Sequence, residues 1–272
     1  MGNIMKDNEK KFFFITVNYN NSTVTKKYIE NVSSFGAIVI VVDNNSSSQD
    51  FSDLKDYCVD KTDVILLRQK ENFGYFKGLN KGLEYLKKEE LGRGFVIIGN
   101  NDLVFPDNFK TILMQRNFSK DTLAIVPDIY TLDGVHQNPH VVSRVSTARK
   151  FFYDIFYTNY YLGTFIRSFY LKFKTVNNIE KDEEEKNIYM GIGAIYILTP
   201  NFFSHFDYLD DRVFLWGEEA LFGNQIAGVN GKILYLPNLE VVHLESMSTS
   251  KIPNRIKYDQ MKRSYRIYRN YL

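Results

Sequence analysis

The chain has 272 residues, of which 44% are hydrophobic and 24% are charged, so a disordered chain is excluded. Its formal net charge of +2 gives no general attraction to nucleic acid, and we expect no nucleic-acid partner. A single cysteine, Cys58, excludes an internal disulfide framework and is typical of a reducing compartment.

The first hundred residues alternate short apolar runs with amphipathic segments. Strands are predicted over residues 12–20, 37–48, 63–69 and 95–102. Helices are predicted over 24–32 and 50–57, and at the end of a glycine-broken stretch over 71–90. This alternation predicts an α/β fold, with a mainly parallel twisted sheet that helices cover on both faces.

Polar clusters follow three of the predicted strands. They read NYN at 18–20, DNN at 43–45 and NND at 100–102. Ligands bind open parallel sheets at the carboxyl ends of the strands, so we expect the three clusters to share one edge and to form a ligand site there.

The second half is less regular. Strands are predicted over 123–131 and 190–199, a helix with its entry loop over 214–227, and a strand pair broken by Pro237 over 232–244. The acidic stretch 180–186 indicates a solvated loop, and the tail 256–272 has basic and aromatic residues at helical spacing.

Motif spacing disfavours three enzyme classes. A dinucleotide fingerprint requires three glycines after the first strand, but the loop after Asn20 has none. Gly223 and Gly228 are spaced as in a P-loop, but Val229 stands where that motif needs lysine. No Gly-x-Ser-x-Gly elbow of a serine hydrolase occurs. A dehydrogenase, a P-loop kinase and a hydrolase are therefore unfavoured.

Two strand-end carboxylates remain as candidate binding groups. Asp43 is placed to accept hydrogen bonds from a base or from ribose hydroxyls, and a cap of its own turn is the alternative. Asp102, with Asn100 or Asn101, offers oxygen ligands of the kind that hard divalent cations take, and a simple loop turn is again the alternative.

Six motifs in order carry a resemblance to a known family. They are VNYN, VVDNNSS, ENFGYFKGLNKGL, GNNDLVFP, FLWGEEALF and VVHL, spread over about residues 13–248. In this order they resemble the family-2 glycosyltransferases, and more narrowly the rhamnosyltransferase-like branch of bacterial polysaccharide and cell-envelope assembly. The resemblance implies a GT-A fold with a Rossmann-like nucleotide-sugar half (1–122), an acceptor-binding and catalytic half (123–248) and a helical tail (249–272).

The resemblance also implies which residues hold the nucleotide-sugar donor. Residues at the ends of the first strands would bind the base and ribose, and those of the glycine-broken loop would approach the diphosphate and sugar. They are Thr16, Val17, Asn18, Tyr19, Asp43, Asn72, Gly74, Lys77, Gly78, Asn80 and Asn101.

A divalent cation, Mg²⁺ or Mn²⁺, is implied beside the donor. Asp102 matches the last acid of the family's Asp-x-Asp motif, and His243 matches a histidine that reaches the metal or the diphosphate. Asn100 replaces the first Asp of that motif, so the site loses one negative charge. We therefore expect a cation requirement that is weakened or dispensable.

The catalytic base is implied in the segment Trp216-Gly217-Glu218-Glu219. Glu219 takes the place of the base, with Glu218 beside it, and burial next to a like charge would raise the pKa of the base. The implied reaction is an inverting transfer of a hexose or deoxyhexose from a UDP- or dTDP-sugar to a cell-surface glycan or lipid-linked acceptor. A helix N-terminus that favours acids is the alternative for the two glutamates.

Two other functions stay open. A sugar nucleotidyltransferase also uses a strand-end nucleotide site and a cation, and a non-catalytic nucleotide-binding module would keep the fold without turnover. Both are distinguished from a glycosyltransferase by their products.

The segment 149–174 is rich in aromatic and basic residues. A cationic, amphipathic patch of this kind is typical of peripheral membrane contact, and a packed subdomain or homo-oligomer interface is the alternative. No apolar run reaches the roughly 20 residues of a membrane span, so we expect a soluble cytoplasmic protein, at the inner face of the cell membrane if the patch binds lipid.

Overall fold

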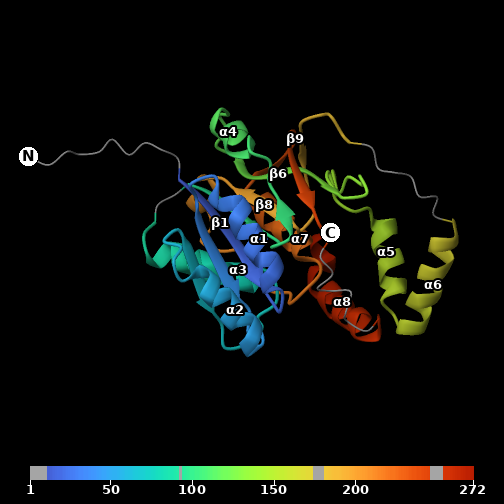
Figure 1. Ribbon diagram of the computed structural model, residues 1–272. Helices are drawn as coiled ribbons and strands as arrows, with labels where there is room; N and C mark the ends of the chain where they lie inside the picture. The colour runs from blue at the N-terminus through green and yellow to red at the C-terminus, as the bar shows by residue number, and fades with distance from the viewer. Residues whose placement is uncertain (1–10, 92–93, 174–180, 246–253) are drawn as a thin grey trace, which may run out of the picture.

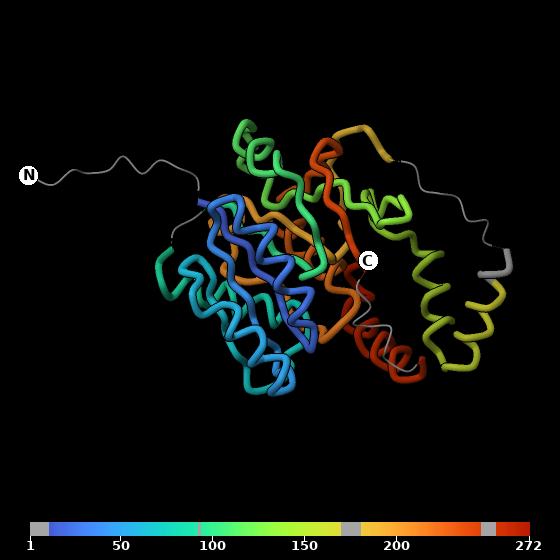
Figure 2. Tube along the Cα trace, in the orientation of Figure 1, coloured from blue at the N-terminus to red at the C-terminus, as the bar shows by residue number. Residues whose placement is uncertain are grey.

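A computed structural model describes residues 11–91, 94–173, 181–245 and 254–272 of the chain (Figures 1 and 2). The polar start up to residue 10, Lys174, Glu180 and the predicted boundary at 248/249 lie outside the described residues. Among the described residues, no helix is long and apolar enough to cross a membrane.

A single sheet of nine strands forms the centre of the molecule, in the order β3-β2-β1-β4-β8-β6-β9-β5, with β7 also paired to β9. Six strands run parallel: β1 Phe12–Asn18, β2 Ile38–Asp43, β3 Val64–Arg68, β4 Phe95–Gly99, β6 Thr122–Thr131 and β9 Lys232–His243. The others are antiparallel to their neighbours: β5 Leu103–Val104, β7 Lys186–Ile188 and β8 Ile195–Leu198. The prediction of a mainly parallel sheet is confirmed.

Helices cover both faces of the sheet because its central strands are apolar on both sides. Along β1, Phe12 and Phe14 face one layer while Phe13 and Ile15 face the other. The first layer holds α1 Ser22–Ser33, α2 Ser48–Cys58 and the short α4 Phe109–Met114. The second holds α3 Phe76–Lys88, α7 Glu218–Ala227 and the short 3-10 helix η1 Phe202–Ser204.

A separate group of helices stands at the side of the sheet away from α2 and α3 (Figure 1). It consists of α5 Thr147–Phe156, α6 Tyr160–Phe173 and α8 Asn254–Tyr268, which the 3-10 helix η2 Arg269–Tyr271 extends. A third apolar cluster, which includes Tyr157, Tyr258 and Tyr265, joins these helices to Ala220 of α7. The aromatic segment 149–174 is thus largely helical, which its sequence did not reveal.

Three predicted elements differ from the observed ones. The segment 232–244 is one strand, because residues 237–239 bulge between Leu236 and Glu240 and take Pro237 out of the ladder. Only 195–198 of the predicted strand 190–199 is extended, because residues 191–194 turn. The acidic segment is the largely exposed loop that the sequence predicts over 181–185, with Lys181 paired to Glu240 of β9 at 2.7 Å, and it differs only at Lys186, which begins β7.

Candidate functional site

The three predicted polar clusters meet at one edge of the sheet. Asn18 Nδ2, at the end of β1, donates to Asp43 Oδ2 of β2 at 2.9 Å. Thr25 of α1 donates to Asn18 Oδ1 at 2.7 Å and accepts from Asn101 Nδ2 at 2.7 Å. This chain of hydrogen bonds joins the ends of β1, β2 and β4, so the predicted convergence at the carboxyl edge is confirmed.

Asp43 is fully buried and part of its own turn. Besides the bond from Asn18, it accepts from the backbone N–H of Ser46 at 3.2 Å. Asp43 therefore caps its own turn, which was the alternative to nucleotide binding in the sequence analysis. Contact with a base or ribose remains a prediction.

Asp50, on α2, belongs to the same network and was missed by sequence reasoning. It accepts from Asn18 Nδ2 at 2.9 Å and from the backbone N–H of Ser22 at 2.8 Å. Burial alone would raise the pKa of the Asp50 carboxyl, but these hydrogen bonds hold that pKa below its ordinary value. Asp50 thus remains an anion that fixes the start of α1 beside β1.

Asn44 organises the predicted donor loop. Its Nδ2 donates to Asn72 Oδ1 at 2.9 Å and to the carbonyl of Gly74 at 2.8 Å. Gly74 has φ +83°, and a Cβ there would lie 2.1 Å from the carbonyl oxygen of Phe214. Only glycine fits this position, which presses the loop against the segment that leads into α7.

The remaining donor residues have different surroundings. The Tyr19 ring is exposed at the edge of the sheet. Lys77 is exposed, with its ammonium 5.1 Å from the centre of the Phe73 ring. A Cβ on Gly78 would lie 3.0 Å from a methyl of Val17, so this glycine lets α3 pack closely on β1.

Two of the predicted donor residues are engaged within the protein. Thr16 is buried and donates to the carbonyl of Gly99 at 2.8 Å, which ties β1 to β4. Asn80 Nδ2 donates to the carbonyl of Leu209 at 3.0 Å and to Asp211 Oδ2 at 2.9 Å. The polar groups of Asn80 therefore link α3 to the 209–211 segment.

The three candidate cation ligands lie together. Register explains this, because β5 follows Asp102 at once and pairs Leu103 with His243. His243 Nε2 lies 3.4 Å from Asp102 Oδ1 and 3.3 Å from Asn100 Nδ2. Asp102 and His243 are both buried.

The side chains of this cluster fit a weak cation site, in which a bound phosphate would have to supply the remaining metal ligands. Among the described residues, no group of three His, Cys, Asp or Glu side chains is arranged to hold a metal ion. One carboxylate and one imidazole would be the protein's share, and the amide of Asn100, whose nitrogen faces His243, would have to turn for its oxygen to join them. Divalent cations of the Mg²⁺ type are commonly held by one or two carboxylates together with substrate phosphates.

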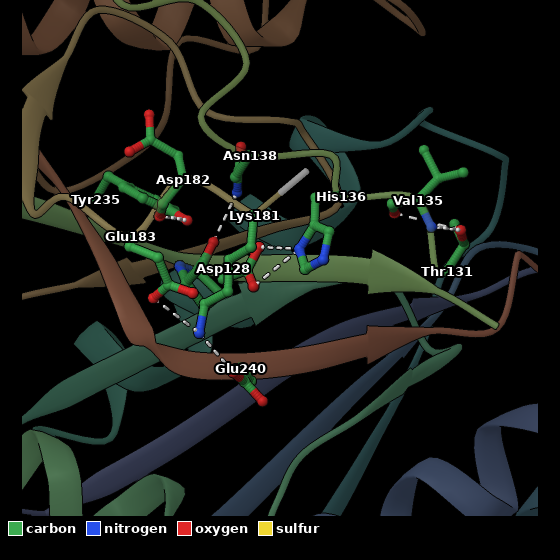
Figure 3. Close-up of polar contacts among 11 residues, drawn as sticks. Asp128, Thr131, Val135, His136, Asn138, Lys181, Asp182, Glu183, Tyr235 and Glu240 are labelled. Atoms are coloured by element: carbon green, nitrogen blue, oxygen red, sulfur yellow. Dashed lines mark hydrogen bonds and ion pairs between the residues drawn. The ribbon is translucent and has the colours of Figure 1, made fainter. Parts of the chain in front are cut away.

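The segment 136–140, with sequence HQNPH, supports this site and was missed by sequence reasoning. His136 contacts the buried Asp128 at 2.9 Å (Figure 3). Asn138 Nδ2 donates to the carbonyl of Pro127 at 3.0 Å. Burial raises the pKa of Asp128, and His136 partly offsets that effect. These contacts fix the segment along β6.

The same segment sets the tautomer of His243. Gln137 Nε2 donates to Glu245 at 2.8 Å, so its Oε1 faces His243 Nδ1 at 2.9 Å and accepts the Nδ1 proton. With Nδ1 held by Gln137, Nε2 is the ring nitrogen that faces Asp102 and Asn100. A histidine held in this way is prepared to bind a metal ion.

Glu219 lies in the first turn of α7 and reaches a turn at the sheet edge. Its Oε1 accepts from the backbone N–H of Gly193 at 3.1 Å, and a Cβ on Gly193 would lie 2.6 Å from that oxygen. Asn138 Oδ1 accepts from the N–H of Ile192 at 2.9 Å, and the N–H of Asn100 donates to the carbonyl of Ala194 at 2.9 Å. The 191–194 turn therefore connects Glu219 to the candidate cation site.

Glu218 is buried and differs sharply from its neighbour. Its Oε1 has no hydrogen-bond partner, as is also true of the buried hydroxyl of Tyr75, whose ring is partly exposed. Burial first, and the charge of Glu219 second, raise the pKa of Glu218 to about 8. The sequence predicted a raised pKa for the base at Glu219, and the structure shows it at the neighbouring Glu218 instead.

A cavity of about 670 Å³ opens beside Glu219. Its polar lining includes Glu219, His140, Arg149 and Arg167, and much of the rest is aromatic, with Phe152, Tyr153 and Tyr268. The walls come from α5, α6, α7 and α8. Trp216 is half-buried outside this cavity, with the ammonium of Lys257 5.7 Å from its ring centre.

Several solved structures have folds similar to that of this chain at low sequence identity. GalNAc-T7 with UDP, GalNAc and Mn²⁺ has a TM-score of 0.62 at 15% identity, over 96% of this chain and 48% of that one. The mannosyltransferase PcManGT from Pyrobaculum calidifontis, with GDP-Man and Mn²⁺, has a TM-score of 0.54 at 13% identity, over 94% and 70%. TarS 1–349 from S. aureus has a TM-score of 0.50 at 14% identity, over 96% and 72%. The chain spans about half the length of GalNAc-T7.

These likenesses confirm the GT-A type of fold. No curated protein matches the chain. The family described as Glycosyl transferase family 2 matches residues 13–181, which is more than half of the sequence. The chain therefore belongs to glycosyl transferase family 2.

Proposed function

We propose that the chain is an inverting glycosyltransferase that moves a sugar from a nucleoside diphosphate donor to a hydroxyl group of a glycan. The observation that carries this proposal is the 191–194 turn. It bonds to Glu219 on one side and to Asn100 of the candidate cation site on the other. The proposed base and the candidate cation site would thus be held by one turn at the same edge of the sheet.

The donor would lie along the carboxyl edge. The exposed ring of Tyr19 is placed to stack on a base, and the ends of β1 and β2 supply amides for hydrogen bonds. Asp102 and His243 would hold a Mg²⁺ or Mn²⁺ ion against the diphosphate, and the amide of Asn100 would turn its oxygen toward the ion as a neutral ligand. When bound, such an ion neutralises charge on the leaving diphosphate.

Glu219 would act as the general base. The acceptor oxygen attacks the anomeric carbon while Glu219 takes its proton, and the bond from that carbon to the diphosphate breaks, with the electron pair leaving on the nucleoside diphosphate. A single base suffices for this displacement, which inverts the configuration. The acceptor would enter through the cavity of about 670 Å³ that Glu219 lines.

Glu218 would have a different role. A carboxyl with a pKa of about 8 is mostly protonated at neutral pH, so it adds little charge beside Glu219. The neutral Glu218 would thereby leave Glu219 as the charged carboxylate that faces the 191–194 turn.

The finer assignment follows the resemblance to the rhamnosyltransferase-like branch. We propose a UDP- or dTDP-hexose or deoxyhexose as donor and a cell-surface glycan, free or lipid-linked, as acceptor. The neutral Asn100 would make the cation requirement weaker than in an enzyme with two acids at this motif.

Two experiments test the proposal. A thermal-shift series with UDP, dTDP, GDP and their sugars, with and without Mn²⁺, should identify one donor that raises the melting temperature by mass action. Glu219→Gln should keep that shift and lose at least a hundredfold of the transfer rate, whereas Glu84→Gln, on the exposed face of α3, should transfer normally.

The products separate this function from its rivals. A glycosyltransferase releases a nucleoside diphosphate from a sugar nucleotide, and a nucleotidyltransferase releases pyrophosphate from a triphosphate. A binding module shows the thermal shift with no turnover under any cation. Normal turnover of Glu219→Gln would show that the base lies elsewhere.

A further inference from the structure

The outer faces of α5 and α6 carry exposed aromatic rings. On α5, Phe151 and Ile155 are four residues apart and 65% and 36% exposed. On α6, Tyr161 and Phe165 are four residues apart and 76% and 68% exposed. This spacing places each pair on one side of its helix, and exposed apolar surface of this extent marks an interaction site.

Positive charge is concentrated in the same group of helices. Residues 147–169 and 254–272 contain nine Lys and Arg but only two Asp, although the whole chain has a net charge of only +2. Both acids have basic partners, since Asp154 pairs with Arg269 and Asp259 with Arg255. The rest of the chain is therefore net acidic.

On α8 the basic and apolar residues alternate on the exposed surface. Arg263 and Arg266 are exposed, as are Ile256 and Ile267, which are 51% and 37% exposed. Basic side chains beside exposed apolar ones are the pattern of helices that lie in a membrane interface.

We propose that α5, α6 and α8 form a docking surface for an anionic lipid bilayer. Aromatic rings would enter the headgroup region, and the arginines would contact lipid phosphates. Charge complementarity favours this occupant, because a second copy of the chain would bring the same positive surface against itself.

The position of the cavity gives this surface a function that rests on the proposed glycosyl transfer. The three helices that would meet the bilayer also form walls of the cavity at Glu219. Arg149 and Arg167 line that cavity, and guanidinium groups suit phosphate. An acceptor glycan linked through phosphate to a membrane lipid would thus reach Glu219 while its lipid stays in the bilayer.

The test is sedimentation of the full chain with vesicles of phosphatidylglycerol or of phosphatidylcholine. Wild type should bind the first and not the second, and 0.5 M NaCl should weaken binding. Each arginine near an anionic surface is worth about fivefold in binding, so Arg263→Gln with Arg266→Gln should weaken it about 25-fold. Phe151→Ser with Phe165→Ser should weaken it at least tenfold.

Matched controls keep the result interpretable. Val59 and Leu132 are 74% and 75% exposed elsewhere on the molecule, and replacing both with Ser should leave binding unchanged. The thermal shift with the cognate sugar nucleotide, measured without lipid, should be the same for every variant and shows that each is folded.

Three results would overturn the docking surface. They are equal binding of the wild type to both lipids, no binding to phosphatidylglycerol, or a wild-type dimer that the two Phe substitutions separate without loss of vesicle binding. A chain that binds vesicles but no sugar nucleotide would instead overturn the proposed function and leave the docking surface in place.

Discussion

The raised pKa of Glu218 makes the stability of the protein depend on pH in a defined way. In the folded chain the pKa of this carboxyl is about 8, against an ordinary value of 4.5. Between these values the unfolded chain has lost the proton and the folded chain keeps it. The free energy of unfolding therefore falls as pH rises through this window.

The size of the effect follows from the two pKa values. Each pKa unit corresponds to about 1.4 kcal/mol, so between pH 5 and pH 8 the ionisation of Glu218 lowers the stability by roughly 3 kcal/mol. Glutamine has the same shape and no ionisation. Glu218→Gln should remove this fall, and its advantage over wild type should grow by roughly 3 kcal/mol across the same range.

Urea denaturation of both proteins at pH 5, 6.5 and 8 measures the effect, with Glu84→Gln on the exposed surface of α3 as the control. Groups other than Glu218 titrate in both proteins and cancel in the difference. Parallel curves for wild type and Glu218→Gln would refute the reasoning. A flattened curve for Glu219→Gln alone would show that the raised pKa had been assigned to the wrong glutamate.

Three further predictions concern the loop and the cation site. Gly74→Ala should destabilise the protein by more than about 3 kcal/mol in urea denaturation, because a Cβ would meet a backbone oxygen at 2.1 Å. The control is Gly134→Ala, which should cost only about 1 kcal/mol, because Gly134 has φ +80° but open space around it. Equal losses of stability in the two variants would contradict the role of the close contact at Gly74. Gln137→Leu should weaken Mn²⁺ binding in the presence of the nucleoside diphosphate by about 10- to 100-fold in calorimetric titration, because His243 loses the acceptor for its Nδ1 proton. Gln137→Glu keeps an acceptor and should retain Mn²⁺ binding. Unchanged binding in the Leu variant would exclude this positioning role. Asn100→Asp should strengthen Mn²⁺ binding at least tenfold by adding a charge, and no change would place the cation elsewhere.

The elements of the first half could be predicted from the sequence because their signals are local. Apolar strands such as β2 and β4 are readable from a few residues, and parallel strands end at the same edge. The meeting of Asn18, Asp43 and Asn101 followed from this rule alone.

Roles that depend on contacts between distant segments could not be read in this way. The sequence does not show that Asn80 binds Leu209 and Asp211, which follow it by 129 and 131 positions in the chain. Nor does it show that Gln137 orients His243. It also does not show which of two adjacent glutamates is buried. Burial decides this, because removal from water raises the free energy of the ionised carboxyl.

The sequence by itself determined the family, the parallel sheet and the edge at which polar residues gather, since each is encoded in a short stretch of chain. The tertiary structure alone decided that residues 191–194 join Glu219 to the candidate cation site, and that α5, α6 and α8 line a cavity beside Glu219. The physical reason is that both arrangements are made by packing segments far apart in the chain, and no local pattern records which segments will touch.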